Sequence, residues 1–514
     1  MVTDVNATAI KIKSQKIENP GQIIQMAIDY LLPGNSSLDT RMDVRNLIND
    51  DYDANLFFYG SINIDKAIQQ TKSRPVYAPK LRTACAPKRP THLMTALPAL
   101  YKRNMVNGFF AFESDYTARA LETIEYACDK ICVSDWREKM AHMREHPVRV
   151  NEESVVAWAE CQDTAKLNRL EKEYKGRQLT DLDVNEYSLF LKPNNKPPVD
   201  TSVQTEVSQP QTVVFHEVSI NAHFGPVFRQ LEENWNSLLL PHVLYNKKKN
   251  IDQIEEFINK VDSSDPEKEF RYLENDFSAY DKSQHVSTWT LEREIYRSLG
   301  LDPELLEVWM DAHWFTKIRS AAVGLTMYVL FQRKSGDVTT SFGNTIVNML
   351  TLFYTFKLTT FVYALFLGDD SLIKVRLAAV DIDVIRSGPT RMMDAFNLIC
   401  KFFVFLYGYF CGYIITKVDG ENKLISDCLR RATKLGRLDI NDARDFKEHW
   451  VSFGDVTRNY DDVLVVQQAA EALAERRADG DMYMLELLYY ALNSIGKSYK
   501  EYRSLYDDEL SASY

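Results

Sequence analysis

Two acidic segments carry the clearest chemical signal in the sequence. Asp276 and Asp281 stand in ENDFSAYDKSQ after a hydrophobic run, and Asp369 and Asp370 follow Gly368 in FVYALFLGDDSLIKV. A carboxylate at the end of a buried strand can be held rigidly toward a cleft, as a metal ligand must be. Glycine permits a tight hairpin turn, and two adjacent anions at its tip repel each other unless a cation lies between them. The pattern predicts a divalent-metal site.

The chemistry expected of such a site is phosphoryl transfer. Mg²⁺ binds a few carboxylates together with phosphate oxygens of a substrate. Two ions about 3.5–4 Å apart clamp the attacking and leaving oxygens of the transferred group. We therefore expect Asp276 and Asp369 to hold two Mg²⁺ or Mn²⁺ ions. An isolated Gly-Asp-Asp is more often an exposed turn, but the flanking hydrophobic runs and the second acidic segment favour the metal site.

A third segment, QRKSGDVTTSFGNTIVNML, places small polar residues at helical spacing. Ser335, Gly336 and Asp337 predict a turn, and Thr340 and Asn344 are four residues apart, so they share a helix face. Small polar side chains on one face suit contacts to sugar hydroxyls. The alternative is an ordinary capped helix, with Ser335 or Asp337 as the N-cap.

Cysteines and histidines in CDKICVSDWREKMAHMREH raise the question of a zinc site. Cys128 and Cys132 are four residues apart, as are His142 and His146, so each pair can share one helix face and bind Zn²⁺. The linker between the pairs is shorter than in the usual zinc finger. We therefore favour two amphipathic helices with a buried thiol pair and surface histidines, and regard bound Zn²⁺ as the less favoured alternative.

Hydrophobic periodicity and turn residues outline the elements that must position these side chains. Strands and helices alternate without strict β-α-β spacing, which predicts an α+β fold. Strands are expected at 211–218, 271–277 and 363–367. Helices are expected at 250–261, 288–299, 303–314 and 344–358, with helical stretches over 115–146 and after residue 439.

Composition limits the class of protein. The chain has 514 residues, of which 45% are hydrophobic and 26% charged, which excludes disordered, collagenous and disulfide-scaffold proteins. At about 100–200 residues per domain we expect about three units. The 7 cysteines and an N-terminus without a signal-peptide pattern predict an intracellular protein. The apolar stretches 349–368 and 398–415 contain Lys357 and Lys401, which favours a buried core over membrane spans.

The three motifs together resemble motifs A, B and C of viral RNA-dependent RNA polymerases. The wording DxxxxDKSQ, SGDxxTxxxNT and GDDSL is similar to that of the alphavirus-like supergroup, nearer its plant and insect virus branches, such as virga-, kita- and closterovirus-like replicases. The resemblance covers about residues 185–510. It implies a right-hand polymerase with an antiparallel palm sheet and an N-terminal extension. The expected divisions are 1–160 (extension and fingers), 161–270 (fingers), 271–420 (palm, with a finger insertion at about 285–330) and 421–514 (thumb).

The resemblance also implies roles for the acidic residues and for one lysine. Asp276 and Asp369 would bind the two metal ions, with Asp370 supporting them. Asp281 would contact the ribose 2′-hydroxyl, the group that distinguishes NTP from dNTP. Lys401 falls in the motif D region, where a lysine protonates the departing pyrophosphate. The alternative for Lys401 is a lysine at the edge of the core with its charge in water.

Further residues are implied to contact the nucleotide. Asn344 would share the 2′-hydroxyl with Asp281, and the motif B residues Ser335, Gly336 and Thr340 would lie against the nucleotide. Lys192 and Lys196 match two finger lysines that neutralise the triphosphate. Where the family usually has a basic residue after the strand histidine, this sequence has Glu217. Arg229 and Lys247–Lys249 are candidates for the missing charge, with a solvated surface as the alternative.

The partners implied by the resemblance are an RNA template, the nascent strand and NTPs. The net charge of −11 limits RNA binding to a local basic patch, and residues 371–440 hold 11 Lys and Arg against 7 Asp and Glu. No helicase P-loop or methyltransferase signature occurs in the sequence, so those activities are expected on other replicase subunits or on a removed portion of the chain. We expect the host cytoplasm as the location, at membrane-associated replication complexes held to the membrane through partners.

Two other functions are consistent with parts of the pattern. A reverse transcriptase-like palm nucleotidyltransferase would share the metal-binding aspartates, but the Asp281 and Asn344 pair argues against it. A non-catalytic RNA-binding or scaffold subunit of a replicase would not need these residues, and every catalytic position is filled. The sequence therefore favours a template-directed RNA polymerase.

Overall fold

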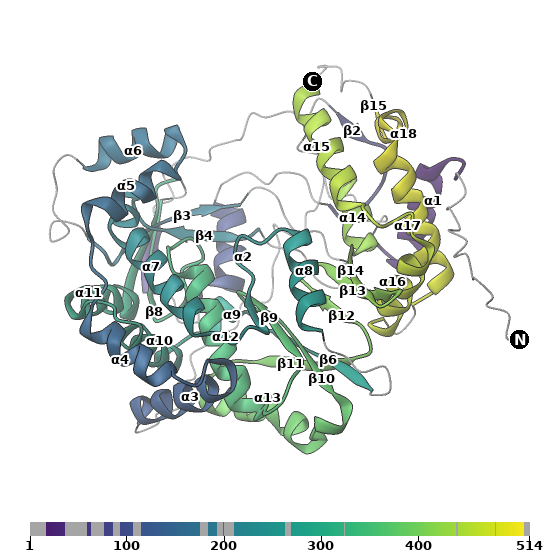
Figure 1. The fold of residues 1–514 in the computed structure, drawn as a ribbon. Helices are drawn as coiled ribbons and strands as arrows, with labels where there is room; N and C mark the ends of the chain where they lie inside the picture. Colours follow the sequence, from purple (N-terminus) through teal and green to yellow (C-terminus); the bar gives the residue numbers. More distant parts are fainter. Residues whose placement is uncertain are drawn as a thin grey trace, which may run out of the picture.

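The computed structural model describes a chain of mixed helix and sheet, as the sequence predicts. The described residues are 17–35, 59–62, 77–85, 93–105, 115–174, 183–192, 199, 210–262, 269–322, 324–437, 440, 442–477 and 480–507. In Figure 1 the C-terminal helices gather on one side of a central sheet, together with the N-terminal helix at 20–31, and the helices of residues 116–238 gather on the other.

The central sheet carries the two acidic segments. Its order is β11-β6-β10-β9-β5, and all neighbours are antiparallel except β5 and β9. The strands predicted at 271–277 and 363–367 are confirmed, and a two-residue turn at Gly368 and Asp369 joins β9 to β10 because Leu367 pairs with Asp370. The five strands are β5 (Val243–Tyr245), β6 (Phe270–Phe277), β9 (Tyr363–Leu367), β10 (Asp370–Arg376) and β11 (Cys400–Phe405).

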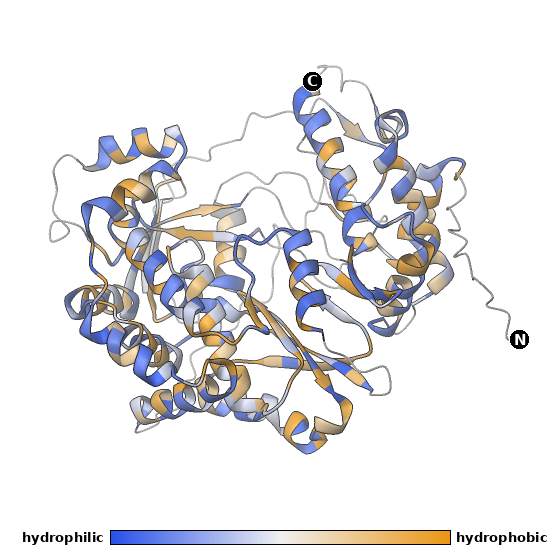
Figure 2. Ribbon diagram, in the orientation of Figure 1, coloured by the Kyte–Doolittle hydropathy of each residue, from blue (hydrophilic) through white to orange (hydrophobic). Residues whose placement is uncertain are grey.

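The largest hydrophobic core packs helices against the central sheet. Helix α12 lies in it with most of its side chains buried, and β9 follows it with its first four residues buried. Figure 2 shows hydrophobic residues along the strands of this sheet and hydrophilic residues over much of the outer helices. The helices of this core are α3 (Tyr116–Ile131), α4 (Trp136–Glu145), α7 (Val218–Leu238), α10 (Val286–Ser298), α11 (Pro303–Trp314), α12 (Thr340–Phe356) and α13 (Ile382–Phe396).

Both apolar stretches are divided among core elements. Residues 349–368 form the second half of α12, a turn and β9, and residues 398–415 fall on β11, β12 and the start of β13. Among the described residues, no helix combines the length and the hydropathy required of a membrane span. The first stretch is largely buried on α12 and β9, as expected. In the second stretch Ile399, Phe403, Val404 and Leu406 are exposed, so the expected buried core holds there only in part.

A second five-stranded sheet has the order β1-β8-β7-β3-β4. Its buried residues pack against α2 (Leu93–Arg103). The predicted strand at 211–218 is shorter than expected, because Val218 begins the long helix α7, which the sequence analysis did not predict. Helices α5 (Glu152–Glu160) and α6 (Thr164–Tyr174) lie against α7. The strands are β1 (Tyr59–Ile62), β3 (Glu186–Leu191), β4 (Thr212–Phe215), β7 (Phe315–Ser320) and β8 (Leu325–Leu330).

The C-terminal part has its own core, to which N-terminal residues contribute. Helix α1 (Pro20–Leu31) packs against α17, and β2 (Ala78–Pro79) pairs with β15 (Tyr506–Asp507). A three-stranded sheet joins this part to the central sheet. The remaining elements are β12 (Gly408–Phe410), β13 (Tyr413–Val418), β14 (Glu421–Ser426), α14 (Cys428–Lys434), α15 (Ala443–Val456), α16 (Val463–Glu475), α17 (Met482–Lys497) and α18 (Tyr499–Ser504).

A buried charge cluster around Asp262 connects the central sheet with the three-stranded sheet. Asp262 follows α8 (Ile251–Val261), and its side chain is 1% exposed. It accepts hydrogen bonds from Lys374 of β10 at 2.9 and 3.0 Å, from Lys417 of β13 at 3.2 Å and from Asn422 of β14 at 3.0 Å. Burial acts to raise the pKa of the Asp262 carboxyl, but the hydrogen bond and charge of Lys374 outweigh it and hold the pKa below its usual value. The cluster therefore fixes the three-stranded sheet against β10.

We expect Asp262→Ala to lower the free energy of unfolding by about 3–5 kcal/mol, because it leaves Lys374 buried without its counter-ion. Urea unfolding followed by circular dichroism measures the change. Asp461→Ala is the control, since Asp461 pairs with Lys497 at 2.7 Å at the surface, where both side chains are more than half exposed. The control should cost less than about 1 kcal/mol. Equal losses in the two variants would contradict a special role for the buried cluster.

Candidate active site

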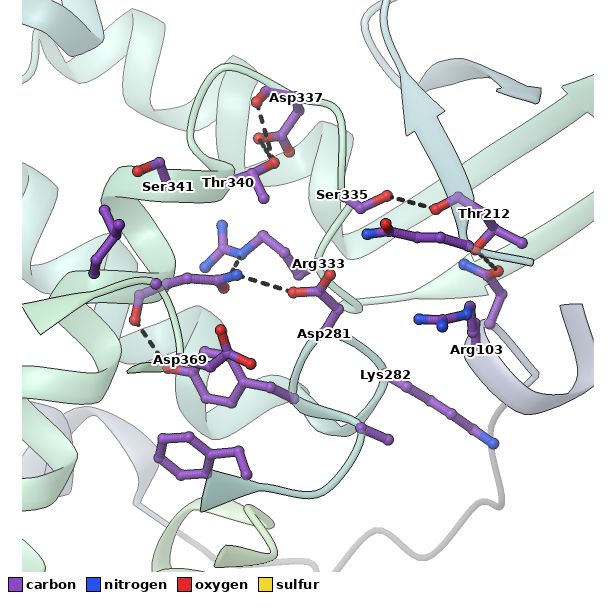
Figure 3. A pocket seen from close by; sticks show the side chains of 18 of the residues that line it. Arg103, Thr212, Asp281, Lys282, Arg333, Ser335, Asp337, Thr340, Ser341 and Asp369 are labelled. Atoms are coloured by element: carbon purple, nitrogen blue, oxygen red, sulfur yellow. Dashed lines mark hydrogen bonds between the residues drawn. The ribbon is translucent and has the colours of Figure 1, made fainter. Parts of the chain in front are cut away.

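A cavity of about 950 Å³ opens between the β9–β10 turn, the start of α12 and the end of α2 (Figure 3). Asp369 lies on one side of it, and Arg103 and Lys282 lie on the opposite side in this view. The lining residues most relevant to chemistry are Arg103, Lys247, Asp281, Lys282, Arg333, Ser335, Asp337, Thr340, Asn344 and Asp369. Residues from all three predicted motifs therefore meet at one cavity.

The β9–β10 turn holds Asp369 in place by contacts to α12. The amide N–H of Gly368 donates to Thr345 Oγ1 at 2.8 Å. Asn348 Nδ2 donates to the carbonyl oxygens of Gly368 and Asp369, both at 3.1 Å. Gly368 has φ +62°, a conformation that glycine adopts without strain. These contacts fix the backbone of the turn, so the exposed Asp369 side chain extends from a rigidly held backbone.

Strand register places Asp276 beside Asp370 and Lys401. Asn275 pairs with Ser371, so one step further along the same register Asp276 lies opposite Asp370. On the other side of β6, Asp276 pairs with Lys401 of β11. Residues directly opposite each other in an antiparallel pair point to the same face of the sheet. The predicted catalytic residues Asp276, Asp370 and Lys401 thus lie side by side at the end of the central sheet that carries the turn.

A cysteine that the sequence analysis did not assign also contacts this group. The Cys411 thiol, in the turn between β12 and β13, is hydrogen-bonded to Asp370. Burial, followed by the negative charge of Asp370, raises the pKa of this thiol above its usual value. Cys411 is therefore a neutral donor that helps to orient the second aspartate of the turn.

The carboxylates suit Mg²⁺ or Mn²⁺ as a partial site. Asp276, Asp369 and Asp370 offer only oxygen ligands, which hard divalent cations prefer. Among the residues that the structure describes, no three or more His, Cys, Asp or Glu side chains are arranged to hold a metal ion by themselves. A site completed by substrate phosphate oxygens needs only one or two protein carboxylates for each Mg²⁺ ion. The arrangement therefore fits metal ions that bind together with a nucleotide.

Asp281 and Asn344 are brought together as the motifs predict. Asn344 Nδ2 donates to Asp281 Oδ1 at 2.9 Å across the cavity wall between α9 (Tyr280–Ser283) and α12. Burial raises the pKa of the Asp281 carboxyl, and the bond from Asn344 and the charge of Arg333 partly oppose this shift. A paired amide and carboxyl at a cavity wall form a polar group that can bind a hydroxyl of a ligand.

The motif B turn is held by its own hydroxyl groups. Ser335 Oγ donates to the Thr212 carbonyl at 3.0 Å, and Thr340 Oγ1 donates to the Lys334 carbonyl at 2.7 Å. Asp337 Oδ1 accepts from the amide of Thr339 at 2.8 Å, and Asp337 Oδ2 lies 2.8 Å from His313 Nε2. The N-cap residue of α12 is Thr339, so the alternative with Ser335 or Asp337 as N-cap does not describe this helix.

Of the two predicted finger lysines, the structure describes only Lys192. Lys192 lies at the end of β3 with Nζ 3.5 Å from Gln211 Oε1, and it is not among the described lining residues. Lys196 lies outside the described residues. The cavity instead has Arg103, Lys247 and Lys282, together with Lys102. Of these, the sequence analysis had named only Lys247, as a candidate for the charge missing at Glu217; Lys247 is paired with Glu232.

Burial changes the pKa of two cations of the cavity. It lowers the pKa of Arg103, an effect that the negative charge of Asp281 partly opposes, and it also lowers the pKa of Lys282. Arg229, the other candidate for the missing charge, lies in a separate cavity of about 310 Å³ that Lys247 also lines. The basic side of the site is therefore built from α2, α9 and the loop after β5.

The structure does not bring the cysteine pair and the histidine pair together. Cys128 and Cys132 lie in the main hydrophobic core, and the Cys128 thiol is hydrogen-bonded to Cys132, which together with burial raises its pKa. His142 and His146 are exposed and stack on each other, with ring centroids 4.3 Å apart. A zinc ligand must be a thiolate, which this environment disfavours. The arrangement matches the favoured interpretation, a buried thiol pair and surface histidines.

Comparison with known proteins points to one family. The model of the family described as "RNA dependent RNA polymerase" matches residues 55–505. The replicase large subunit of Soil-borne wheat mosaic virus (strain United States/Nebraska/1981) is 34% identical over 454 residues, covering 88% of this chain and 24% of that protein. That of Youcai mosaic virus is 33% identical over 461 residues, covering 88% and 27%. The RNA-directed RNA polymerase of Barley stripe mosaic virus is 29% identical over 473 residues, covering 91% and 59%.

These matches confirm the resemblance to polymerases of the alphavirus-like supergroup. The family match begins at residue 55, well before the start at about residue 185 that the motifs indicated. The chain spans about a quarter of the length of the replicase large subunits that it matches. Because the family model covers most of the chain, the chain belongs to the RNA-dependent RNA polymerase family.

Proposed function

We propose that this chain is the RNA-dependent RNA polymerase of a positive-strand RNA virus, catalysing template-directed nucleotidyl transfer in genome replication and transcription. One observation carries the proposal beyond family membership. Asp369, the Asp281–Asn344 pair and the motif B turn come from different elements and line the same cavity. A carboxylate for metal ions and a polar pair for ribose are the groups that nucleotide addition requires.

Asp276 and Asp369, with Asp370 in support, would hold two Mg²⁺ or Mn²⁺ ions. Such ions, when bound, lower the pKa of the primer 3′-hydroxyl and neutralise charge on the triphosphate. The chain's own cations Arg103, Lys247 and Lys282 then add positive charge along the cavity wall where a triphosphate enters. Positive groups placed before the reaction stabilise charge that develops in its transition state.

Three further sets of residues have roles in this proposal. Asp281 and Asn344 bind the ribose 2′-hydroxyl, and Ser335, Gly336 and Thr340 keep the motif B turn in the shape that presents Asn344. We assign Lys401 the role of giving a proton to the departing pyrophosphate, and its position beside Asp276 in register and its exposure support this assignment. Lys192 and Lys196 remain candidates for contacting the triphosphate from the fingers.

The right-hand layout of such polymerases supplies a domain assignment. We assign the central sheet, apart from its edge strand β5, to the palm, 271–420. We assign the sheet containing β7 and β8 to the fingers, 161–270 with the insertion at about 285–330. The C-terminal helices, 421–514, form the thumb. Residues 1–160 form the N-terminal extension and contribute to the fingers, with α1 packed on α17. Antiparallel pairing of β6, β10 and β9 supports the palm assignment.

The partners follow from the reaction and from the relatives. We infer that the chain binds an RNA template, the nascent strand and NTPs. Some of its relatives are named replicase large subunits, and the chain matches about a quarter of their length. Methyltransferase and helicase activities would therefore lie elsewhere in the replicase. We place the enzyme in the host cytoplasm, at replication complexes attached to membranes through partners.

Primer extension on an RNA template with Mg²⁺ tests the proposed activity. We expect the wild type to incorporate NTPs in preference to dNTPs. Asp369→Asn should lower the rate by about 10³-fold or more, because a metal ligand contributes several kcal/mol and each 1.36 kcal/mol is about tenfold in rate.

The matched control for Asp369 is Asp419→Asn, which removes an exposed carboxylate from another hairpin tip, between β13 and β14. It should keep the wild-type rate. Incorporation by Asp369→Asn at the wild-type rate would disprove the site assignment. A wild-type preference for dNTPs would instead favour a reverse transcriptase.

Two substitutions at Lys401 test its role as a proton donor. Lys401→Ala should lower kcat about 10²-fold with little change in KM, because general acid catalysis contributes about 10²–10⁴-fold. Lys401→Arg keeps the charge, but a guanidinium does not release its proton at neutral pH. We expect it to remain slow in single-turnover measurements. Full activity of Lys401→Arg would show that Lys401 acts through its charge alone.

A further inference from the structure

The amide of Asn344 is held in one orientation by two donors. Its Oδ1 accepts from Gln284 Nε2 at 2.7 Å and from Arg333 Nε at 2.9 Å. Arginine has no acceptor atom, so the atom of Asn344 facing Arg333 must be the oxygen. The Nδ2 group is thereby directed to Asp281, 2.9 Å away. A reversed amide would place its oxygen against the Asp281 carboxyl and its N–H groups against two donors.

Arg333 contacts both members of the ribose-binding pair. Its backbone N–H donates to the carbonyl oxygen of Asp281 at 3.0 Å, while its side chain donates to Asn344. Tyr280, the neighbour of Asp281, donates from its hydroxyl to the Asn344 carbonyl at 3.0 Å. The relative position of α9 and α12 therefore depends on Arg333, which lies just before the motif B turn.

Arg333 is itself fixed by a buried ion pair. Its Nη2 donates to Glu292 Oε1 at 2.6 Å, and the two side chains are 2% and 9% exposed. Glu292 Oε1 also accepts from the Tyr296 hydroxyl at 2.7 Å, and Arg333 Nη1 lies 3.3 Å from Thr339 Oγ1. The guanidinium is planar and rigid, so when Glu292 fixes its Nη2 group, the Nε group that donates to Asn344 is fixed as well.

The backbone of α12 leaves room for this ion pair at Gly343, the residue before Asn344. A Cβ atom at Gly343 would lie 2.3 Å from Glu292 Oε1, 2.7 Å from the Tyr296 hydroxyl and 2.8 Å from Arg333 Nη1. Only glycine permits so close an approach. The ion pair is thus packed directly against the turn of α12 that presents Asn344 to the cavity.

We propose that Arg333, anchored by Glu292, is a positioning residue for sugar selection: it holds the Asn344 amide toward Asp281 and so sets the preference for ribonucleotides. The inference rests on the proposed polymerase function, since it concerns the nucleotide site. Without the Arg333 Nε donor, Asn344 Oδ1 keeps only the hydrogen bond from Gln284, and the amide is held less firmly in the orientation that serves a 2′-hydroxyl. Hydrogen bonds involving a charged group contribute enough for roughly a 10–100-fold effect.

Arg333→Lys is the decisive variant, because lysine keeps the charge beside Glu292 but lacks the second, fixed donor that reaches Asn344. The readout is the ratio of kcat/KM for an NTP to that for the matching 2′-deoxy-NTP, measured by single-nucleotide primer extension on an RNA template. We expect the ratio to fall roughly 10–100-fold, mainly through weaker use of the NTP. Thermal melting measured in parallel reports whether the fold is retained.

Arg293→Lys is the matched control. Arg293 follows Glu292 on α10 and pairs with Glu307 at 2.6 Å near the surface, away from Asn344. Its substitution alters an arginine–glutamate pair between α10, the helix that also carries Glu292, and α11. It should leave the nucleotide ratio unchanged. If Arg333→Lys fails to fold, Glu292→Gln is the second variant: it removes the anchoring charge, keeps the side-chain shape and should also lower the ratio.

A double variant separates positioning from direct contact with the nucleotide. Asn344→Ala should lower the ratio by itself, and adding Arg333→Lys should cause no further fall, because Arg333 then has no amide to orient. An additional fall of the same factor would overturn the proposal, as would an unchanged ratio in Arg333→Lys alone. Failure of the wild type to extend the primer would overturn the proposed function itself, which is a different result from an active enzyme with unaltered selection.

Discussion

The site depends on holding two adjacent aspartates at a two-residue turn in a fixed position. Asp369 and Asp370 repel each other, and a free turn would relax by moving them apart. Helix α12 prevents this movement, because Thr345 and Asn348 hydrogen-bond to the backbone of the turn. The same stretch of α12 carries Asn344, which reaches Asp281. One buried helix thereby fixes the distance between the acidic turn and the Asp281–Asn344 pair.

The second constraint is electrostatic, because the chain is acidic and the proposed substrates, RNA and nucleoside triphosphates, are polyanions. The net charge is −11, yet Arg103, Lys247 and Lys282 meet at the cavity from elements far apart in the sequence. Arg103 and Lys247 lie outside the three motifs. Lys282 stands in DxxxxDKSQ, and packing brings it beside α2, where its Nζ donates to the Tyr101 carbonyl at 3.3 Å. Charge within about a Debye length of 8–10 Å, not the total, decides what the cavity attracts.

Local pattern predicted the elements near the motifs and failed where tertiary contacts decide. The strands at 271–277 and 363–367 and the helix at 303–314 followed from periodicity and turn residues. Helix α7 was missed because its first residues continue a β-branched run and Pro226 lies within it. The packing of α1 on α17 links opposite ends of the chain, which no local signal encodes. The hydrogen bonds from the Ser335 and Thr340 hydroxyls to backbone carbonyls were also not predictable, because these partners come together only in the folded turn.

The buried ion pair of Arg333 and Glu292 is best explained by orientation, not by stability. Moving two charges out of water costs several kcal/mol each, and apolar residues of similar volume are often at least as stabilising. Arg333 donates to the side-chain oxygen of Asn344, whereas an apolar side chain in its place would leave that oxygen with the hydrogen bond from Gln284 alone. The Asp262 cluster differs, because it holds two sheets together and contacts no cavity residue that must be oriented. Burying charge is unfavourable in both clusters. Of the two, the Arg333–Glu292 pair is the one that orients a cavity side chain, the Asn344 amide.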